Sequence, residues 1–184
     1  MTIEIGIIGL AQSGKTTIFN ALTGGKSDIR SLAPHIGIAK VPEPRLQVLS
    51  DMLHPKKVVP AEVSYIDIGA SVKDLGGGKG VGGQILNQLS CADALIDVVR
   101  SFADETVPHI EGSLDIARDI ATDNLELTLH DLGIISRRLE KIEESLKGAK
   151  PAERQCLLPE QNLLTRLKAG LEKEVPIREM GLSA

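Results

Sequence analysis

Two glycines, a lysine and a threonine near the start of the chain have the spacing of a phosphate-binding loop. In the stretch GLAQSGKT, four residues separate Gly9 from Gly14, and Lys15 and Thr16 follow directly. Glycines let backbone N–H groups approach phosphate oxygens, and the positive end of a following helix favours the same negative charge. In this pattern the lysine reaches the β- and γ-phosphates and the threonine hydroxyl binds Mg²⁺. The stretch therefore predicts a site for a nucleotide with Mg²⁺.

The predicted nucleotide contacts come from the second half of this loop and the first turn of the helix after it. We assign them to Gln12, Ser13, Gly14, Lys15, Thr16 and Thr17. The metal needs a further ligand, and Asp67 ends the apolar stretch YIDI, where a carboxylate can hold the water shell of Mg²⁺. An aspartate at the end of a strand is also a common turn former. The loop upstream favours the metal role for Asp67.

A second glycine motif competes with the first. Gly78, Gly80 and Gly83 in GKGVGG satisfy the G-x-G-x-x-G pattern of dinucleotide-binding folds. That pattern requires a strand directly before the first glycine. Here the preceding strand ends well upstream, at Asp67. We therefore interpret residues 76–83 as a flexible loop.

The composition excludes several functional classes. The chain has 184 residues with a net charge of −4, and its only aromatic residues are two Phe and one Tyr. This argues against base stacking on single-stranded nucleic acid and against direct DNA binding. Cys91 and Cys156 lack metal-ligand spacing and are expected to be free thiols. Because the sequence shows no signal peptide and no membrane span, we expect a cytoplasmic protein.

Strand and helix patterns alternate in the first two thirds of the chain. This alternation predicts an α/β fold with a mostly parallel sheet and helices on both faces. The expected strands are residues 3–9, 37–41, 61–69 and 94–102, and the expected helices are 15–23, 44–53 and 83–94.

The last third of the chain has a different pattern, with apolar residues spaced three and four apart. Such spacing predicts two helices packed on each other as an antiparallel hairpin, at residues 119–148 and about 157–175, with a break at Gly148 and Pro151. The predicted domains are a nucleotide-binding part at 1–118 and a helical arm at 119–184. The first seam is Leu125, Leu129, Leu132, Ile135, Leu139, Ile142 and Leu146, and the second is Leu157, Leu164, Leu167 and Leu171.

With these motifs the chain resembles the YchF/Obg-like family of P-loop NTPases over nearly its whole length. The specific stretches are ADALIDVVRSFADETVPHIEG and DNLELTLHDLGIISRRLEK, besides the glycine loop. The resemblance implies a Ras-like P-loop fold with an inserted coiled-coil arm, and slow hydrolysis of Mg²⁺-bound GTP or ATP as a switch. It also implies contact of the arm with a ribosome or another protein. By this resemblance Ser31 stands where the family has a metal-facing threonine, and His109 matches a candidate catalytic histidine; otherwise His109 is a surface loop residue.

The chain also departs from the family pattern. In the family, the glycine after the central strand falls at the position of Ala70, whereas here it comes one place earlier, at Gly69. Ser71 stands at the next family position, where a hydrophobic residue is usual. In the glycine loop, Ala11-Gln12-Ser13 replaces the family's Pro-Asn-Val. The family's base-recognition segment is expected beyond Ala184, so the sequence does not distinguish GTP from ATP. These departures favour an alternative function, a non-hydrolysing nucleotide-binding or scaffold module whose arm contacts a ribosome or protein. Turnover measured beside nucleotide binding separates the two.

Overall fold

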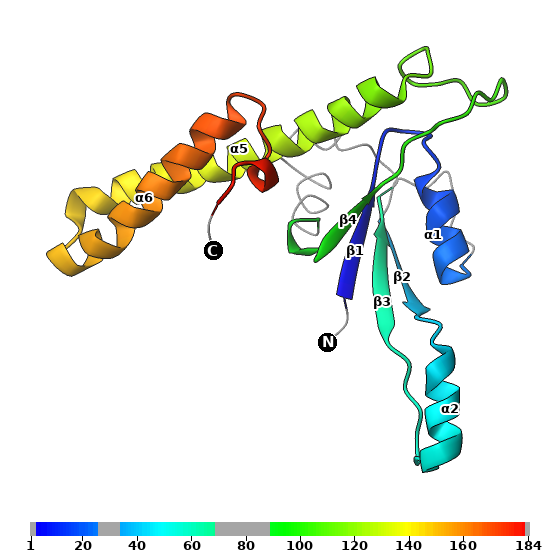
Figure 1. Cartoon of the computed structure of the whole chain (residues 1–184). Helices are drawn as coiled ribbons and strands as arrows, with labels where there is room; N and C mark the ends of the chain where they lie inside the picture. Colours follow the sequence, from blue (N-terminus) through cyan, green and yellow to red (C-terminus); the bar gives the residue numbers. More distant parts are fainter. Residues whose placement is uncertain (1–2, 26–33, 69–88, 183–184) are drawn as a thin grey trace. The chain divides into compact units, whose positions relative to one another are not determined.

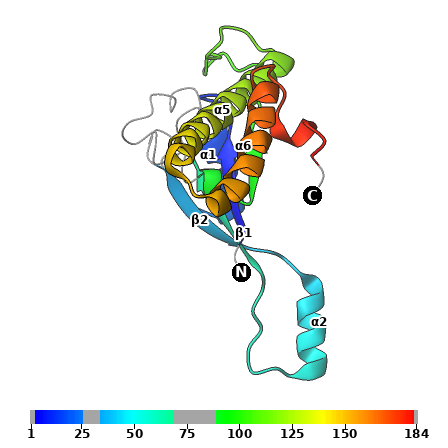
Figure 2. The same cartoon turned by 90° about the vertical axis from the view of Figure 1, so that its left-hand side faces the viewer.

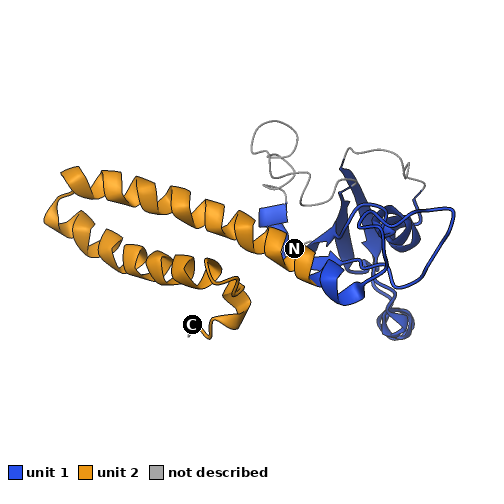
Figure 3. Ribbon diagram, turned by 90° about the horizontal axis from the view of Figure 1, so that it is seen from above, with its two compact units in different colours: residues 1–120 blue, residues 121–184 orange. Residues whose placement is uncertain are grey.

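The structure of the chain, a computed structural model, describes residues 3–25, 34–68 and 89–182 (Figure 1). The chain divides into two compact units, residues 1–120 and 121–184 (Figure 3). None of the helices among the described residues combines the length and the apolar character needed to cross a membrane.

The first unit is built on a sheet of four strands in the order β2-β3-β1-β4. These are β1 (Ile3–Ile8), β2 (His35–Lys40), β3 (Glu62–Asp67) and β4 (Ala94–Asp97). Strand β1 runs parallel to both β3 and β4, whereas β2 runs antiparallel to β3. The carboxyl ends of the three parallel strands therefore lie at one edge of the sheet, and the amino end of β2 lies at the same edge.

Helix α1 (Lys15–Thr23) begins at this edge and packs on one face of the sheet. Its Phe19 is buried in a cluster with Ile7 and Val98. Close packing on β2 depends on Gly37, because a Cβ atom there would lie 2.6 Å from the Thr23 side chain and 2.8 Å from that of Phe19. The helix predicted at residues 15–23 has these bounds.

Helix α2 (Pro44–Leu53) connects β2 to β3 along the chain. It extends beyond the end of the sheet opposite the glycine loop (Figures 1 and 2). The Glu43 side chain caps it by accepting a hydrogen bond from the backbone N–H of Arg45. None of its residues is buried, although Val48, Met52 and Leu53 are apolar. Packing therefore contributes little to this helix, and the cap with Pro44 in the first turn defines where it starts.

The second unit contains two long helices that run antiparallel (Figures 1 and 3). Helix α5 (Ile116–Gly148) starts at the end of the first unit, and α6 (Pro151–Leu171) is followed by the short helix η1 (Ile177–Glu179). They pack through one apolar cluster, and an exposed ion pair, Arg138 with Glu160, joins their outer faces. The buried members of the cluster are Ile135, Leu139, Leu167 and Leu171.

The structure corrects several predicted boundaries. The strand predicted at 94–102 ends at Asp97, and residues 98–115 form neither helix nor strand. The chain turns there because the Arg100 guanidinium donates to the carbonyl oxygens of Phe102 and Asp104, at 3.1 and 3.2 Å. Helix α6 begins at Pro151 rather than near residue 157. The loop predicted at 76–83 and most of the helix predicted at 83–94 lie outside the described residues.

The first leucine seam is only partly buried. Leu125 and Leu129 are 39% and 51% exposed, whereas the polar residues Asp123 and Thr128 of the same helix are buried. Regular apolar spacing predicted the helix correctly, but the packed seam begins only further along α5, with Ile135 and Leu139 buried.

Candidate functional site

The glycine loop, residues 9–14, joins β1 to α1 in a conformation that needs its glycines. Gly9 and Gly14 have φ angles of 139° and 107°, and Gln12 has a φ of 63°. A Cβ atom on Gly9 would lie 2.4 Å from the backbone oxygen of Val98, so a larger residue does not fit there. The loop turns back on itself through a hydrogen bond from Ser13 N–H to the Leu10 carbonyl oxygen, 3.2 Å long.

The first turn of α1 presents backbone N–H groups at the end of this loop. Gly14 is the N-cap residue, so no side chain caps the helix, and no acidic residue stands in its first turn. Helix N-termini carry partial positive charge and bind anions when no side chain occupies them. The geometry suits a phosphate group.

The Lys15 side chain folds back onto the glycine loop. Its side chain is 4% exposed, and Nζ donates hydrogen bonds to the carbonyl oxygens of Gly9 and Leu10, at 2.9 and 2.7 Å. The loop thus holds a buried ammonium group beside the N-terminus of α1. A bound phosphate would compete with these two carbonyls for the same N–H donors.

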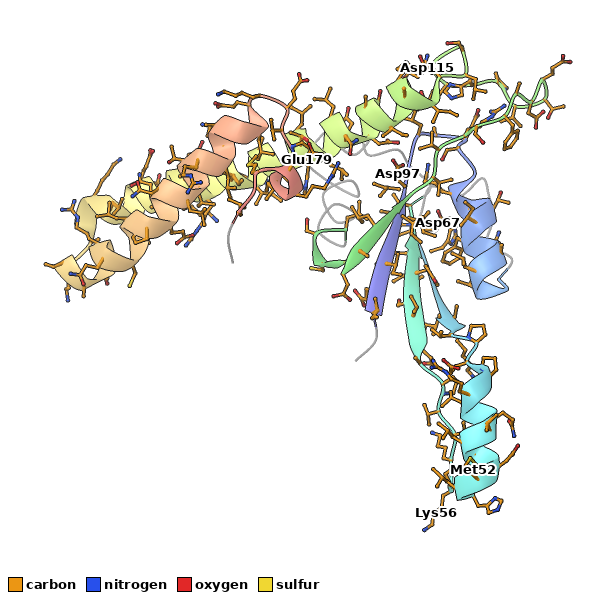
Figure 4. All side chains as sticks on the ribbon, viewed as in Figure 1. Met52, Lys56, Asp67, Asp97, Asp115 and Glu179 are labelled. Atoms are coloured by element: carbon orange, nitrogen blue, oxygen red, sulfur yellow. The ribbon has the colours of Figure 1, made fainter. Side chains whose placement is uncertain are left out.

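Asp67 ends β3 at the same edge of the sheet. Figure 4 shows it near the start of α1, with Asp97, the last residue of β4, close to the same edge. Asp67 is fully buried, and neither carboxylate oxygen has a hydrogen-bond partner among the described residues. Burying a carboxylate without partners is costly, and a bound cation removes that cost. The environment of Asp67 therefore fits a divalent metal ligand, and its oxygens suit Mg²⁺.

His109 is held by its own segment and by α5. Its Nδ1 accepts a hydrogen bond from the Glu111 N–H at 3.2 Å, and its Nε2 lies 2.9 Å from an Asp119 carboxylate oxygen. By distance this second contact is an ion pair when His109 is protonated, and the same Asp119 oxygen accepts no hydrogen bond from the described residues. The Arg118 guanidinium donates twice to the other oxygen of Asp119, at 3.0 and 2.8 Å. These contacts of His109 do not involve the glycine loop.

The remaining predicted residues differ in their surroundings. Gln12 and Thr17 are exposed and Thr16 is half-buried, whereas the Ser13 hydroxyl oxygen is buried without a hydrogen-bond partner in the described part of the chain. Ser31 lies outside the described residues. Sequence reasoning missed His35, the first residue of β2, which pairs with Asp67 across the sheet. Its place in SLAPHIG, shortly after Ser31, was the available signal.

The chain is similar to several curated proteins over almost its entire length. It is 35% identical over 185 residues to the "Ribosome-binding ATPase YchF" of Bacillus subtilis, covering 98% of this chain and 50% of that protein. It is 31% identical to "Obg-like ATPase 1" of Rattus norvegicus, covering 96% of this chain and 46% of that protein. This chain belongs to the YchF/Obg-like family. No family model matches it.

Structural comparison agrees with this membership of the YchF/Obg-like family. The YchF GTPase of Schizosaccharomyces pombe superimposes with a TM-score of 0.72 at 28% sequence identity, covering 99% of this chain and 50% of that one. The predicted fold class, a mostly parallel sheet with helices in a P-loop arrangement, is confirmed. The chain spans about half the length of the curated relatives that it matches.

Proposed function

We propose that this chain binds Mg²⁺ with ATP or GTP at the glycine loop and hydrolyses the nucleotide slowly, as a switch. One observation carries the proposal: Asp67 is fully buried, has no hydrogen-bond partner among the described residues, and lies at the sheet edge where the Lys15 loop and α1 begin. An anion site beside an unsatisfied carboxylate is what a metal–phosphate complex requires.

Each predicted residue has a role in this proposal. Lys15 exchanges its two loop carbonyls for phosphate oxygens, and the backbone N–H groups of residues 12–17 surround the phosphates. Thr16, Ser31 and Asp67 hold Mg²⁺. When bound, Mg²⁺ neutralises charge that develops on the β- and γ-phosphate oxygens.

His109 is the candidate catalytic group, and its contacts impose a condition. A histidine acts as a base or proton donor through a ring nitrogen that faces the reacting group. Here Nδ1 accepts the Glu111 N–H and Nε2 faces the buried Asp119. His109 must therefore leave Asp119 before it can serve hydrolysis, which keeps turnover slow.

The same contacts favour the second candidate, a nucleotide-binding module that does not hydrolyse. In either case the relatives named as ribosome-binding ATPases suggest a ribosome as partner. We assign that contact to the helical arm, residues 119–184, and nucleotide binding to residues 1–118. This proposal places the protein in the cytoplasm.

Calorimetric titration of Mg²⁺–ADP and of a non-hydrolysable Mg²⁺–ATP analogue tests the proposed function. Wild-type chain should bind both nucleotides, and Lys15→Met should lose most of the affinity. The control is Lys56→Met, at an exposed position shortly after α2, which should bind as wild type does. Unchanged affinity in Lys15→Met would refute the site. Phosphate release measured with Mg²⁺–ATP and Mg²⁺–GTP then separates slow hydrolysis from the non-hydrolysing alternative, and His109→Asn tests the catalytic role.

A further inference from the structure

A histidine stands beside the proposed metal aspartate, on a different strand. His35 and Asp67 are directly opposed in the antiparallel pairing of β2 with β3. Residues opposed in this way point to the same face of the sheet, with Cβ atoms roughly 4.5–5.5 Å apart. An imidazole and a carboxylate therefore project side by side at the edge where α1 begins.

The His35 ring faces α1, and its Nε2 atom is shielded from solvent. Its ring centroid lies 6.3 Å from that of Phe19, a buried residue of α1. The Nε2 atom is buried and has no hydrogen-bond partner among the described residues. Phe19 offers only carbon atoms, so the helix leaves this nitrogen unsatisfied.

The two neighbouring side chains do not satisfy each other. A hydrogen bond between His35 Nε2 and one Asp67 oxygen would satisfy two buried atoms, yet Nε2 and both carboxylate oxygens all lack partners among the described residues. Burying polar atoms without partners destabilises the folded chain. A cation bound by both side chains would remove the cost for the imidazole nitrogen and the carboxylate together.

We propose that His35 is a nitrogen ligand of the metal ion held by Asp67, and that it makes this site favour Mn²⁺ over Mg²⁺. The inference rests on the proposed function for the location of the metal. Mg²⁺ binds oxygen ligands and keeps its water, whereas imidazole suits transition metals. Mn²⁺ accepts the same octahedral oxygen ligands and tolerates one nitrogen. With Thr16 and nucleotide oxygens, His35 and Asp67 complete a mixed nitrogen–oxygen set.

Pulsed electron paramagnetic resonance of bound Mn²⁺ tests this directly. The chain is produced with ¹⁵N-labelled histidine, and spectra are recorded with Mn²⁺ alone and with Mn²⁺–ADP. We expect hyperfine coupling to a histidine ¹⁵N nucleus, which adenine nitrogens cannot imitate because they are unlabelled. His35→Asn should abolish the coupling, and the control variant His54→Asn should retain it, because His54 is exposed and its left-handed backbone conformation suits Asn.

Calorimetry provides a second readout. The ADP affinity with Mn²⁺ divided by that with Mg²⁺ should fall about fivefold or more in His35→Asn and stay unchanged in the exposed control His54→Asn. Bound Mn²⁺ without histidine coupling in wild-type chain would overturn the proposal, and this result needs no variant to fold. If ADP binds with neither cation, the proposed function fails, while the spectrum with Mn²⁺ alone still decides the role of His35: coupling supports it, and its absence refutes it.

Discussion

Replacing Lys15 by methionine tests whether the lysine stabilises the loop before any nucleotide binds. The substitution keeps most of the aliphatic stem and removes the ammonium group, which donates to the Gly9 and Leu10 carbonyl oxygens at 2.9 and 2.7 Å. Hydrogen bonds from a charged donor contribute about 1.5–3 kcal/mol each. The variant also avoids burying a charge, which offsets part of this loss. We expect the free energy of unfolding of the first unit to fall by about 2–4 kcal/mol.

The single tyrosine makes this loss measurable. Tyr65 lies in β3, within the first unit, and the chain has no tryptophan. Urea unfolding followed by tyrosine fluorescence therefore reports on this unit separately from the helical unit. Lys56→Met, at an exposed position, serves as control and should match wild type. An unchanged midpoint in Lys15→Met would show that the two hydrogen bonds do not stabilise the loop.

When nucleotide binds, Lys15 should contact phosphate instead of the loop carbonyls. Nucleotide should therefore enlarge the difference in stability between wild type and Lys15→Met. A ligand at a hundred times its dissociation constant stabilises the native state by about 2.7 kcal/mol. Wild-type chain should gain this with Mg²⁺–ADP, whereas Lys15→Met, about a hundredfold weaker in binding, should gain almost nothing at the same concentration. Equal stabilisation of both proteins by nucleotide would place the phosphates elsewhere.

Three further substitutions test other parts of the structure. Asp119→Ala removes the carboxylate that faces His109, so hydrogen exchange in residues 106–113 should accelerate about tenfold or more, whereas Glu105→Ala, at an exposed position, should not change it. Leu171→Ala, in the buried cluster between α5 and α6, should cost about 2–5 kcal/mol in thermal unfolding, far more than Glu160→Gln at the exposed ion pair. Burial raises the pKa of Asp131, so the stability of the wild-type chain falls as pH rises through that pKa. Asp131→Asn should therefore be slightly more stable than wild type at neutral pH. This difference in stability should vanish below pH 3.8, the ordinary pKa of an aspartate.

Local chemistry explains why part of this structure could be predicted from sequence. The glycine loop and α1 follow from residue types within one short stretch, since the glycines fix the turn and Lys15 starts the helix. Asp67 was found for the same reason, because it ends a strongly apolar strand. Pro151 likewise starts α6 through its own backbone preference, because its fixed φ suits the first helical position.

Long-range contacts explain what sequence reasoning missed. The role inferred for His35 depends on its register opposite Asp67, and no local pattern encodes which residues two strands oppose. The end of β4 depends on Arg100 bonding to carbonyl groups further along the chain. The pairing of His109 with Asp119 joins a loop to a helix turn, so the sequence alone left its role open.

The position of β1 in the sheet has a consequence for the order of folding. The first strand of the chain is flanked on one side by β3 and on the other by β4, whose residues follow much later in the sequence. Contacts between such distant segments form slowly, whereas the contacts between α5 and α6 close a short loop and form fast. The glycine loop follows the carboxyl end of β1. Val98, just after β4, donates its N–H to the Ile8 carbonyl oxygen and lies against Gly9, the first residue of the loop. During synthesis the loop can therefore take its final shape only after residue 98 has left the exit tunnel, so the ability to bind phosphate would report that β4 has paired with β1.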